Sequence, residues 1–148
     1  MTSAQRISNI DDITGYRLDC RLLCDFLIVD DDQEIRIYLK NIINYRRGNN
    51  NVVDFSSVLD TLNYIDCINV KNIKCAIIDL NLNDGNGLTI VDKLLSKDKN
   101  CPIIIYSGDY SSIASAYEVY DNISIVHKTD LGRLYNILGI GDKYECYC

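Results

Sequence analysis

Hydrophobic and polar residues alternate along the chain in short segments, and the clearest of these segments begins at Phe26. Phe26–Val29 is a continuous apolar run with β-branched members, and the three carboxylates of Asp30–Asp32 follow it at once. Such a run is typical of a strand that is buried on both faces. Apolar residues then recur at helical spacing from Ile35 to Ile43, where Asp32 can cap the helix and Gly48 can end it. The pattern predicts a strand, an acidic loop and a helix.

The same alternation of strand and helix repeats along the chain. Further strands are expected over residues 52–55, 75–78, 102–106 and 123–126, and further helices over residues 58–65, 88–95, 113–119 and 131–138. Five helices between continuously apolar strands predict an α/β fold of the flavodoxin-like type, a three-layer α/β/α sandwich with a five-stranded parallel sheet. We expect this domain over residues 25–140, with an N-terminal extension or linker at 1–24 and a C-terminal tail at 141–148.

Composition limits the functions that such a domain can have. The chain of 148 residues has a net charge of -6, which disfavours direct binding to nucleic acid or to anionic lipid. The seven cysteines are an odd number, and reduced, mostly buried thiols in a cytoplasmic protein fit them best. No apolar run approaches the roughly 20 residues of a membrane span. We therefore expect a cytoplasmic protein with no membrane span.

Polar residues stand where four of the expected strands end. They are Asp30 and Asp31 after the first strand, Asp79 after the third, Ser107 after the fourth and Lys128 after the fifth. Ligands of such sheets lie beyond the carboxyl ends of the strands. Three carboxylates gathered there need a proton or a hard cation, and oxygen ligands favour Mg²⁺. Each residue alone is more often a helix cap, a turn residue or a solvated charge, so the combination carries the prediction.

Four segments resemble the motifs of one known family, the receiver domains of two-component response regulators, whose fold is called CheY-like. Leu27–Asp31 resembles the acidic pair of the family, and Asp79–Gly87 resembles the segment with the phosphoacceptor Asp. Ile103–Gly108 is similar to the strand that ends in Ser or Thr, and Val126–Thr129 to the strand that ends in the essential Lys. The four motifs occur in the family's order, which is far more specific than any one of them.

The resemblance implies a role for each of these residues. Asp79 would accept a phosphoryl group from a phosphohistidine on a histidine kinase or a histidine phosphotransfer protein. Asp31, Asp79 and the backbone carbonyl of Asn81 would bind Mg²⁺ directly, and Asp30 would act through water. Lys128 would pair with the phosphoryl oxygens and Ser107 would bond one of them. The resulting movement would repack the face of the fourth helix, fifth strand and fifth helix, which would bind a downstream partner protein or a second copy of the chain.

The sequence also departs from the family at several positions, among them Asn86, where Asp is common. Asn83 stands where Pro usually follows the phosphoacceptor, and Thr129 stands where a cis-forming Pro usually follows Lys. Ile125 occupies the position of the aromatic switch residue, so an aromatic rotamer change cannot report phosphorylation here. One alternative is therefore an interaction module that keeps the fold and acts without phosphorylation. A Mg²⁺-dependent phosphatase with an Asp nucleophile is the other, although it needs an acid where Asn81 stands.

Overall fold

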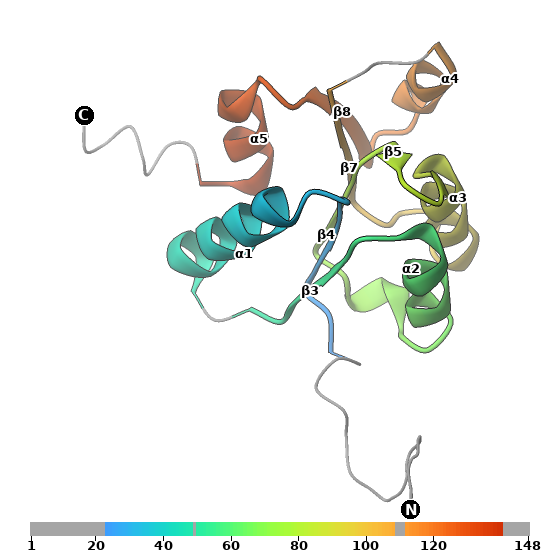
Figure 1. Ribbon diagram of the computed structural model, residues 1–148, viewed down its shortest axis with the longest axis horizontal. Coiled ribbons are helices and arrows are strands. Elements are labelled where there is room, and N and C mark those ends of the chain that lie inside the picture. The colour runs from blue at the N-terminus through green and yellow to red at the C-terminus, as the bar shows by residue number, and fades with distance from the viewer. Residues whose placement is uncertain (1–22, 49, 109–111, 141–148) are drawn as a thin grey trace, which may run out of the picture.

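Five parallel strands form one sheet in the order β3-β2-β4-β7-β8 (Figure 1). The computed structural model describes residues 23–48, 50–108 and 112–140. The strands are β2 (Phe26–Val29), β3 (Val52–Phe55), β4 (Cys75–Ile78), β7 (Ile103–Ser107) and β8 (Ile123–His127). The helices are α1 (Gln33–Arg47), α2 (Val58–Ile65), α3 (Leu88–Lys97), α4 (Ser112–Ser115) and α5 (Leu131–Leu138). The predicted flavodoxin-like fold is confirmed.

Helices cover both faces of the sheet (Figure 1). Because neighbouring residues of a strand point to opposite sides, each strand packs against helices on both faces. Leu27 and Val29 of β2 pack in the core layer beneath α2 and α3. Phe26 and Ile28 pack in the other layer, beneath α1 and α5. All four residues of β2 are buried, so the apolar run that predicts this strand serves two cores at once.

The helix ends follow from local chemistry that the sequence already contains. The side chain of Asp32 accepts a hydrogen bond from the amide of Glu34 at 2.9 Å and caps α1, as predicted. Gly48 ends α1 with a φ of 81°, a conformation that residues with a Cβ rarely adopt. Asp130 caps α5 in the same way as Asp32 caps α1, through the amide of Arg133. These caps fix where each helix leaves the edge of the sheet.

Some local elements differ from the sequence prediction. The loop after Asp79 contains a two-stranded antiparallel hairpin, β5 (Asn81–Leu82) and β6 (Gly85–Asn86). A 3-10 turn, η2 (Val70–Asn72), precedes β4. The helix expected over residues 113–119 is only one α-helical turn, α4, which tightens into the 3-10 helix η3 (Ala116–Val119). A segment this short gains few hydrogen bonds for the residues that it orders, and no side chain caps η3.

The remaining expectations concern the termini, the thiols and membrane spans. Nearly all of segment 1–24 and the whole of 141–148 lie outside the described residues, so their expected roles stay predictions. Within the described ranges Cys24, Cys75 and Cys101 are buried, Cys67 is exposed and none of these four cysteines forms a disulfide. No helix in those ranges combines the length and the apolar character needed to cross a membrane.

Candidate functional site

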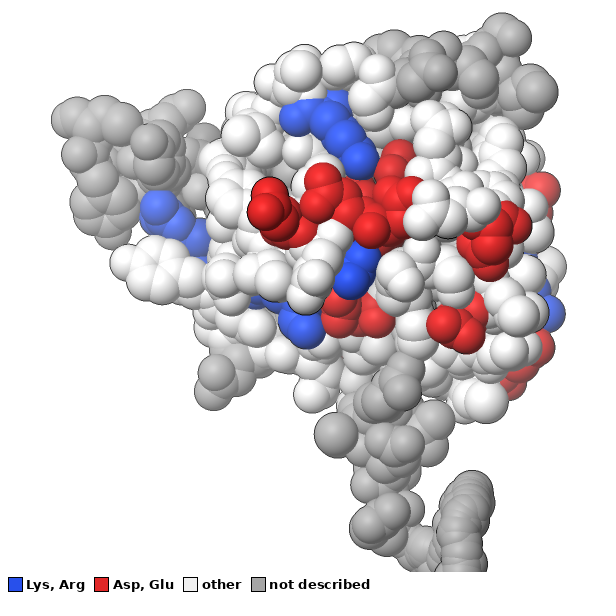
Figure 2. All heavy atoms as spheres, in the orientation of Figure 1, with Lys and Arg blue, Asp and Glu red and all other residues white. Residues whose placement is uncertain are grey.

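The carboxyl ends of the strands bring four of the predicted site residues to one edge of the sheet. Asp30 and Asp79 follow β2 and β4 directly, and the amide of Asp79 donates to the carbonyl of Val29 at 2.8 Å. Ser107 is the last residue of β7, and Lys128 follows β8. Figure 2 shows acidic side chains gathered on this face of the molecule, with basic side chains beside them.

Three of these carboxylates form a cluster. One carboxylate oxygen from each of Asp30, Asp31 and Asp79 lies within 4.8 Å of the other two. Asp30 is only 2% exposed and Asp79 only 5%, whereas Asp31 is half-buried. Burying carboxylates together is unfavourable unless positive charge offsets their repulsion. The donor set consists of oxygen only, which is the set that suits a hard cation such as Mg²⁺.

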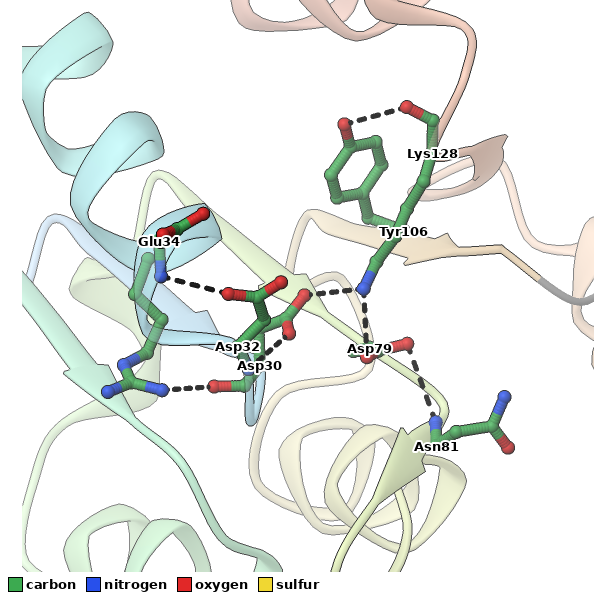
Figure 3. Close-up of polar contacts among 8 residues, drawn as sticks. Asp30, Asp32, Glu34, Asp79, Asn81, Tyr106 and Lys128 are labelled. Atoms are coloured by element: carbon green, nitrogen blue, oxygen red, sulfur yellow. Dashed lines mark hydrogen bonds and ion pairs between the residues drawn. The ribbon is translucent and has the colours of Figure 1, made fainter.

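Lys128 supplies positive charge to the cluster (Figure 3). Its Nζ lies 2.8 Å from Oδ2 of Asp30 and 3.0 Å from Oδ2 of Asp79. Burial alone would lower the pKa of Lys128, but its hydrogen bonds to the two carboxylates outweigh burial and raise this pKa. Burial raises the pKa of the more deeply buried Asp30 despite its bond to Lys128. The cluster therefore already holds one cation between two of its carboxylates.

The backbone around Asp30 is fixed by contacts from α1. The amide of Asp32 donates to Oδ1 of Asp30 at 2.9 Å. Arg36 donates from Nη1 to the carbonyl of Asp30 at 2.6 Å and from Nε to Oδ2 of Asp54 at 3.0 Å. These bonds aim the carboxylate of Asp30 at Lys128, because they hold the loop between β2 and α1 on both sides.

The loop after Asp79 is held just as closely. The amide of Asn81 donates to Oδ1 of Asp79 at 3.4 Å, and the amide of Gly87 donates to the carbonyl of Leu80 at 2.8 Å. A Cβ at Gly87 would lie 2.0 Å from the backbone oxygen of Asp79. Only glycine, which has no Cβ, fits at this position without a clash. The chain therefore turns back against Asp79 before α3 begins.

The same loop also caps a neighbouring helix. Oδ1 of Asp84 accepts from the amide of Val58 at 2.7 Å, and Oδ2 accepts from the amide of Leu59 at 3.1 Å. These two amide bonds lower the pKa of Asp84. Asp84 therefore ties the Asp79 loop to the first turn of α2, where a negative charge is favourable.

Ser107 and Ile125 lie on neighbouring strands. Ser107 is fully buried, and its carbonyl accepts from the amide of Lys128 at 3.1 Å. Ile125 is buried in the core layer that includes α2 and α3, and its carbonyl accepts from Nη1 of Arg133 on α5. The position that the resemblance predicts for the aromatic switch residue therefore carries an aliphatic side chain within the core.

Several residues that shape the site are absent from the sequence prediction. The roles of Arg36 and Gly87 are hard to predict from a single sequence, since their contacts depend on how α1 and the Asp79 loop fold back. Nothing in the sequence indicates a role for Tyr106 in the site, because packing alone explains an aromatic residue in a buried strand. Its hydroxyl nevertheless donates to the carbonyl of Lys128 at 3.2 Å (Figure 3).

Fold and site together define a class of protein: a doubly wound parallel sheet with an acidic cluster and a lysine at the carboxyl ends of its strands. The family model of the response regulator receiver domain matches residues 26–137. The chain therefore belongs to the response regulator receiver domain family, whose members are usually regulatory phosphoacceptors rather than enzymes. No curated protein matches the sequence.

Solved structures agree with this family. A CheY-like receiver domain protein from Methanospirillum hungatei JF-1 is 22% identical, with a TM-score of 0.63, over 82% of this chain and 98% of that one. The response regulator TrrA from Thermotoga maritima, solved with Mg²⁺ and BeF, is 18% identical, with a TM-score of 0.62, over 79% and 97%. A Burkholderia pseudomallei response regulator with a phosphorylated aspartic acid and a calcium ion is 21% identical, with a TM-score of 0.58, over 71% and 59%. At these identities the likeness carries the fold alone.

Proposed function

We propose that this chain is a phosphoacceptor of a two-component or phosphorelay system and that Asp79 receives the phosphoryl group. The observation that carries the proposal is the cluster of Asp30, Asp31 and Asp79 with Lys128 bound to it. The phosphorylated aspartic acid of the Burkholderia pseudomallei response regulator supports the same reading.

The donor is a phosphohistidine on a histidine kinase or a histidine phosphotransfer protein. A carboxylate oxygen of Asp79 attacks the phosphorus, a P–O bond forms and the P–N bond to the donor histidine breaks. The electron pair of that bond stays on the imidazole, which takes a proton from water. Lys128 binds the phosphoryl oxygens, and the hydroxyl of Ser107 donates a hydrogen bond to one of them.

Mg²⁺ fits the donor set of the cluster, in which two of the three carboxylates already bind the ammonium group of Lys128. Asp31, Asp79 and the backbone carbonyl of Asn81 would bind the ion directly, and Asp30 would act through water. When bound, Mg²⁺ neutralises negative charge on the incoming phosphoryl oxygens. The Mg²⁺ and BeF in the TrrA structure support this choice of ion.

The chemistry makes the protein a switch rather than an enzyme, with activity limited to its own phosphorylation and slow hydrolysis of the acyl phosphate. Its output face comprises α4, β8 and α5, which would bind a downstream partner protein or a second copy of the chain. With Ile125 buried and aliphatic, that signal must travel without an aromatic rotamer change. We place this function in the cytoplasm, where the donor kinases present their phosphohistidine.

Intact-mass spectrometry tests the proposal. The protein is incubated with acetyl phosphate and Mg²⁺, and we expect the mass of one phosphoryl group to be added. Asp79→Asn should remove this addition, whereas Asp121→Asn, at an exposed position before β8, should keep it. An unmodified wild-type protein, or an Asp79→Asn variant that is still phosphorylated, would disprove the proposal.

The second candidate is an interaction module that keeps this fold and acts without phosphorylation. The observations that favour it are the aliphatic Ile125 in the core and Thr129 in place of proline after Lys128. It predicts partner binding that is indifferent both to Asp79→Asn and to Mg²⁺.

A further inference from the structure

The turn after β8 carries Lys128 without the proline that usually follows this lysine, since Thr129 stands there. A proline would restrict the backbone at this point by fixing its own φ. Residues of β7 hold the backbone of Lys128 instead. The amide of Lys128 donates to the carbonyl of Ser107 at 3.1 Å, and the carbonyl of Lys128 accepts from the hydroxyl of Tyr106 at 3.2 Å. Two consecutive residues of one strand therefore bind both backbone polar groups of Lys128.

The imidazole of His127 holds the same turn from the other side. Its Nδ1 accepts from the amide of Thr129 at 3.2 Å and lies 2.8 Å from the hydroxyl of Thr129. Both contacts form when the ring proton is on Nε2, because Nδ1 is then an acceptor. The amide of Asp130 also donates to the carbonyl of His127 at 2.8 Å. The ring therefore spans Lys128 and closes the turn as an Asn or Asp side chain does in an Asx-turn.

The position of this turn decides where the ammonium group of Lys128 can reach. The lysine side chain is a flexible four-carbon stem, so the placement of Nζ depends on a fixed backbone. Nζ is held 2.8 Å from Asp30 and 3.0 Å from Asp79, between two carboxylates that follow different strands. The hydroxyl of Tyr106 is suited to its part, because Tyr106 is 5% exposed and burial raises its pKa. It stays protonated and remains a donor at neutral pH.

We propose that Tyr106 and His127 are positioning residues that hold Lys128 at the phosphoryl site in a turn that lacks proline. This inference rests on the proposed function of Asp79 and Lys128. Neither residue needs to touch the phosphoryl group, since both act through the backbone of the turn.

Three variants of the full chain separate positioning from packing. Tyr106→Phe removes only the hydroxyl, and His127→Phe removes the acceptor but keeps a ring. His127→Asn keeps an acceptor that can reach the amide two residues on. Tyr117→Phe is the matched control, because it removes a hydroxyl bonded to Asp92 at 2.6 Å, outside the turn.

The rate of phosphorylation by acetyl phosphate and the affinity for Mg²⁺ are measured separately. We expect the rate to fall about tenfold or more in both Phe variants at the turn, since small misplacements of a catalytic group have effects of this size. Tyr117→Phe should keep the wild-type rate, and His127→Asn should recover most of it. The affinity for Mg²⁺ should stay unchanged in all variants. Wild-type rates in both turn Phe variants, a His127→Asn variant as slow as His127→Phe, or an equal loss of Mg²⁺ affinity would overturn the inference.

Crystal structures of the same variants test the positioning role independently of whether Asp79 accepts phosphate. We expect the contact of 3.0 Å between Nζ of Lys128 and Oδ2 of Asp79 to be lost in the turn Phe variants and kept in His127→Asn. An intact contact in both Phe variants refutes the positioning role, even if the wild-type protein accepts phosphate. An unphosphorylated wild-type protein refutes the proposed function, and the loss of the contact would still support the positioning role.

Discussion

The two ends of the central strands β2, β4 and β7 differ in how they bury polar groups. At the amino-terminal end lie the thiols of Cys24, Cys75 and Cys101, all buried among apolar side chains. Burial raises the pKa of Cys24 to about 11 and that of Cys101 to about 12. The thiols of Cys24 and Cys101 are therefore neutral at physiological pH, so their burial needs no counterion.

At the carboxyl end the same three strands deliver Asp30, Asp79 and Ser107, which are equally buried. Here the burial of charge is offset by Lys128 and by the amides of the loops. The comparison shows that one sheet supports two kinds of burial: apolar packing that stabilises the fold, and buried charge that is unfavourable alone and serves binding.

The largest effect on stability is expected at Gly87, where the carboxyl end of the strands is most closely packed. Gly87→Ala would place a Cβ 2.0 Å from the backbone oxygen of Asp79, which cannot move without shifting the site. We expect the free energy of unfolding to fall by about 3 kcal/mol, as for severe overpacking, in urea denaturation. Gly108→Ala is the control, because a Cβ there meets nothing within 4 Å. Equal stability of the two variants would contradict the close approach.

A smaller effect is expected at the amino-terminal end. Cys101→Ser replaces a fully buried thiol by a more polar hydroxyl, at a cost of about 2 kcal/mol in thermal or urea unfolding. Cys67→Ser changes an exposed residue and should leave stability unaltered. Both variants should be phosphorylated like the wild type. A Cys101→Ser protein that folds with full stability but loses phosphorylation would contradict the claim that the amino-terminal end serves stability alone.

The smallest effects on stability are expected for two aspartates at the carboxyl end, Asp30 and Asp84. Replacing each by Asn should change the free energy of unfolding in opposite directions. Burial raises the pKa of Asp30, so the native state favours its protonated form and the charged form is unfavourable at neutral pH. Asp30→Asn should therefore increase the free energy of unfolding at pH 7 without Mg²⁺ by an amount on the order of 1 kcal/mol. The gain should shrink as the pH falls through the raised pKa of Asp30.

Asp84→Asn is the matched comparison for Asp30→Asn. Bonds from the amides of Val58 and Leu59 lower the pKa of Asp84, so its charge stabilises the native state above the ordinary value of 3.8 and this contribution is lost at lower pH. The Asn variant should be less stable than the wild type at pH 7. If both variants changed stability in the same direction, burial at Asp30 and amide bonding at Asp84 would not have the opposite effects described here.

Most of the fold follows from the sequence because the strands of a doubly wound sheet are continuous apolar runs. Phe26–Val29 is such a run, and the cap at Asp32 fixes where α1 begins. The cluster also follows, since parallel strands deliver the residues after them to one edge. The family and the fold are confirmed by the family model and the structural neighbours.

Contacts between distant segments were beyond prediction. The hairpin after Asp79 and the close approach of Gly87 depend on how a loop folds back, which spacing does not encode. The reach of Arg36 to the carbonyl of Asp30 depends on the rotation of α1. The bond from Tyr106 to Lys128 joins residues 22 positions apart, and only the register of β7 and β8 brings them together.

In the function proposed above, Asp79 is the phosphoacceptor of a site that binds Mg²⁺. A crystal structure of the protein grown with Mg²⁺ and beryllofluoride tests it most directly, because this group mimics an acyl phosphate. We expect beryllofluoride bonded to a carboxylate oxygen of Asp79, with a metal ion bound by Asp31 and Asp79 and with Lys128 and Ser107 contacting the fluorides. A bare Asp79 under these conditions, with Lys128 still bridging Asp30 and Asp79, would contradict it.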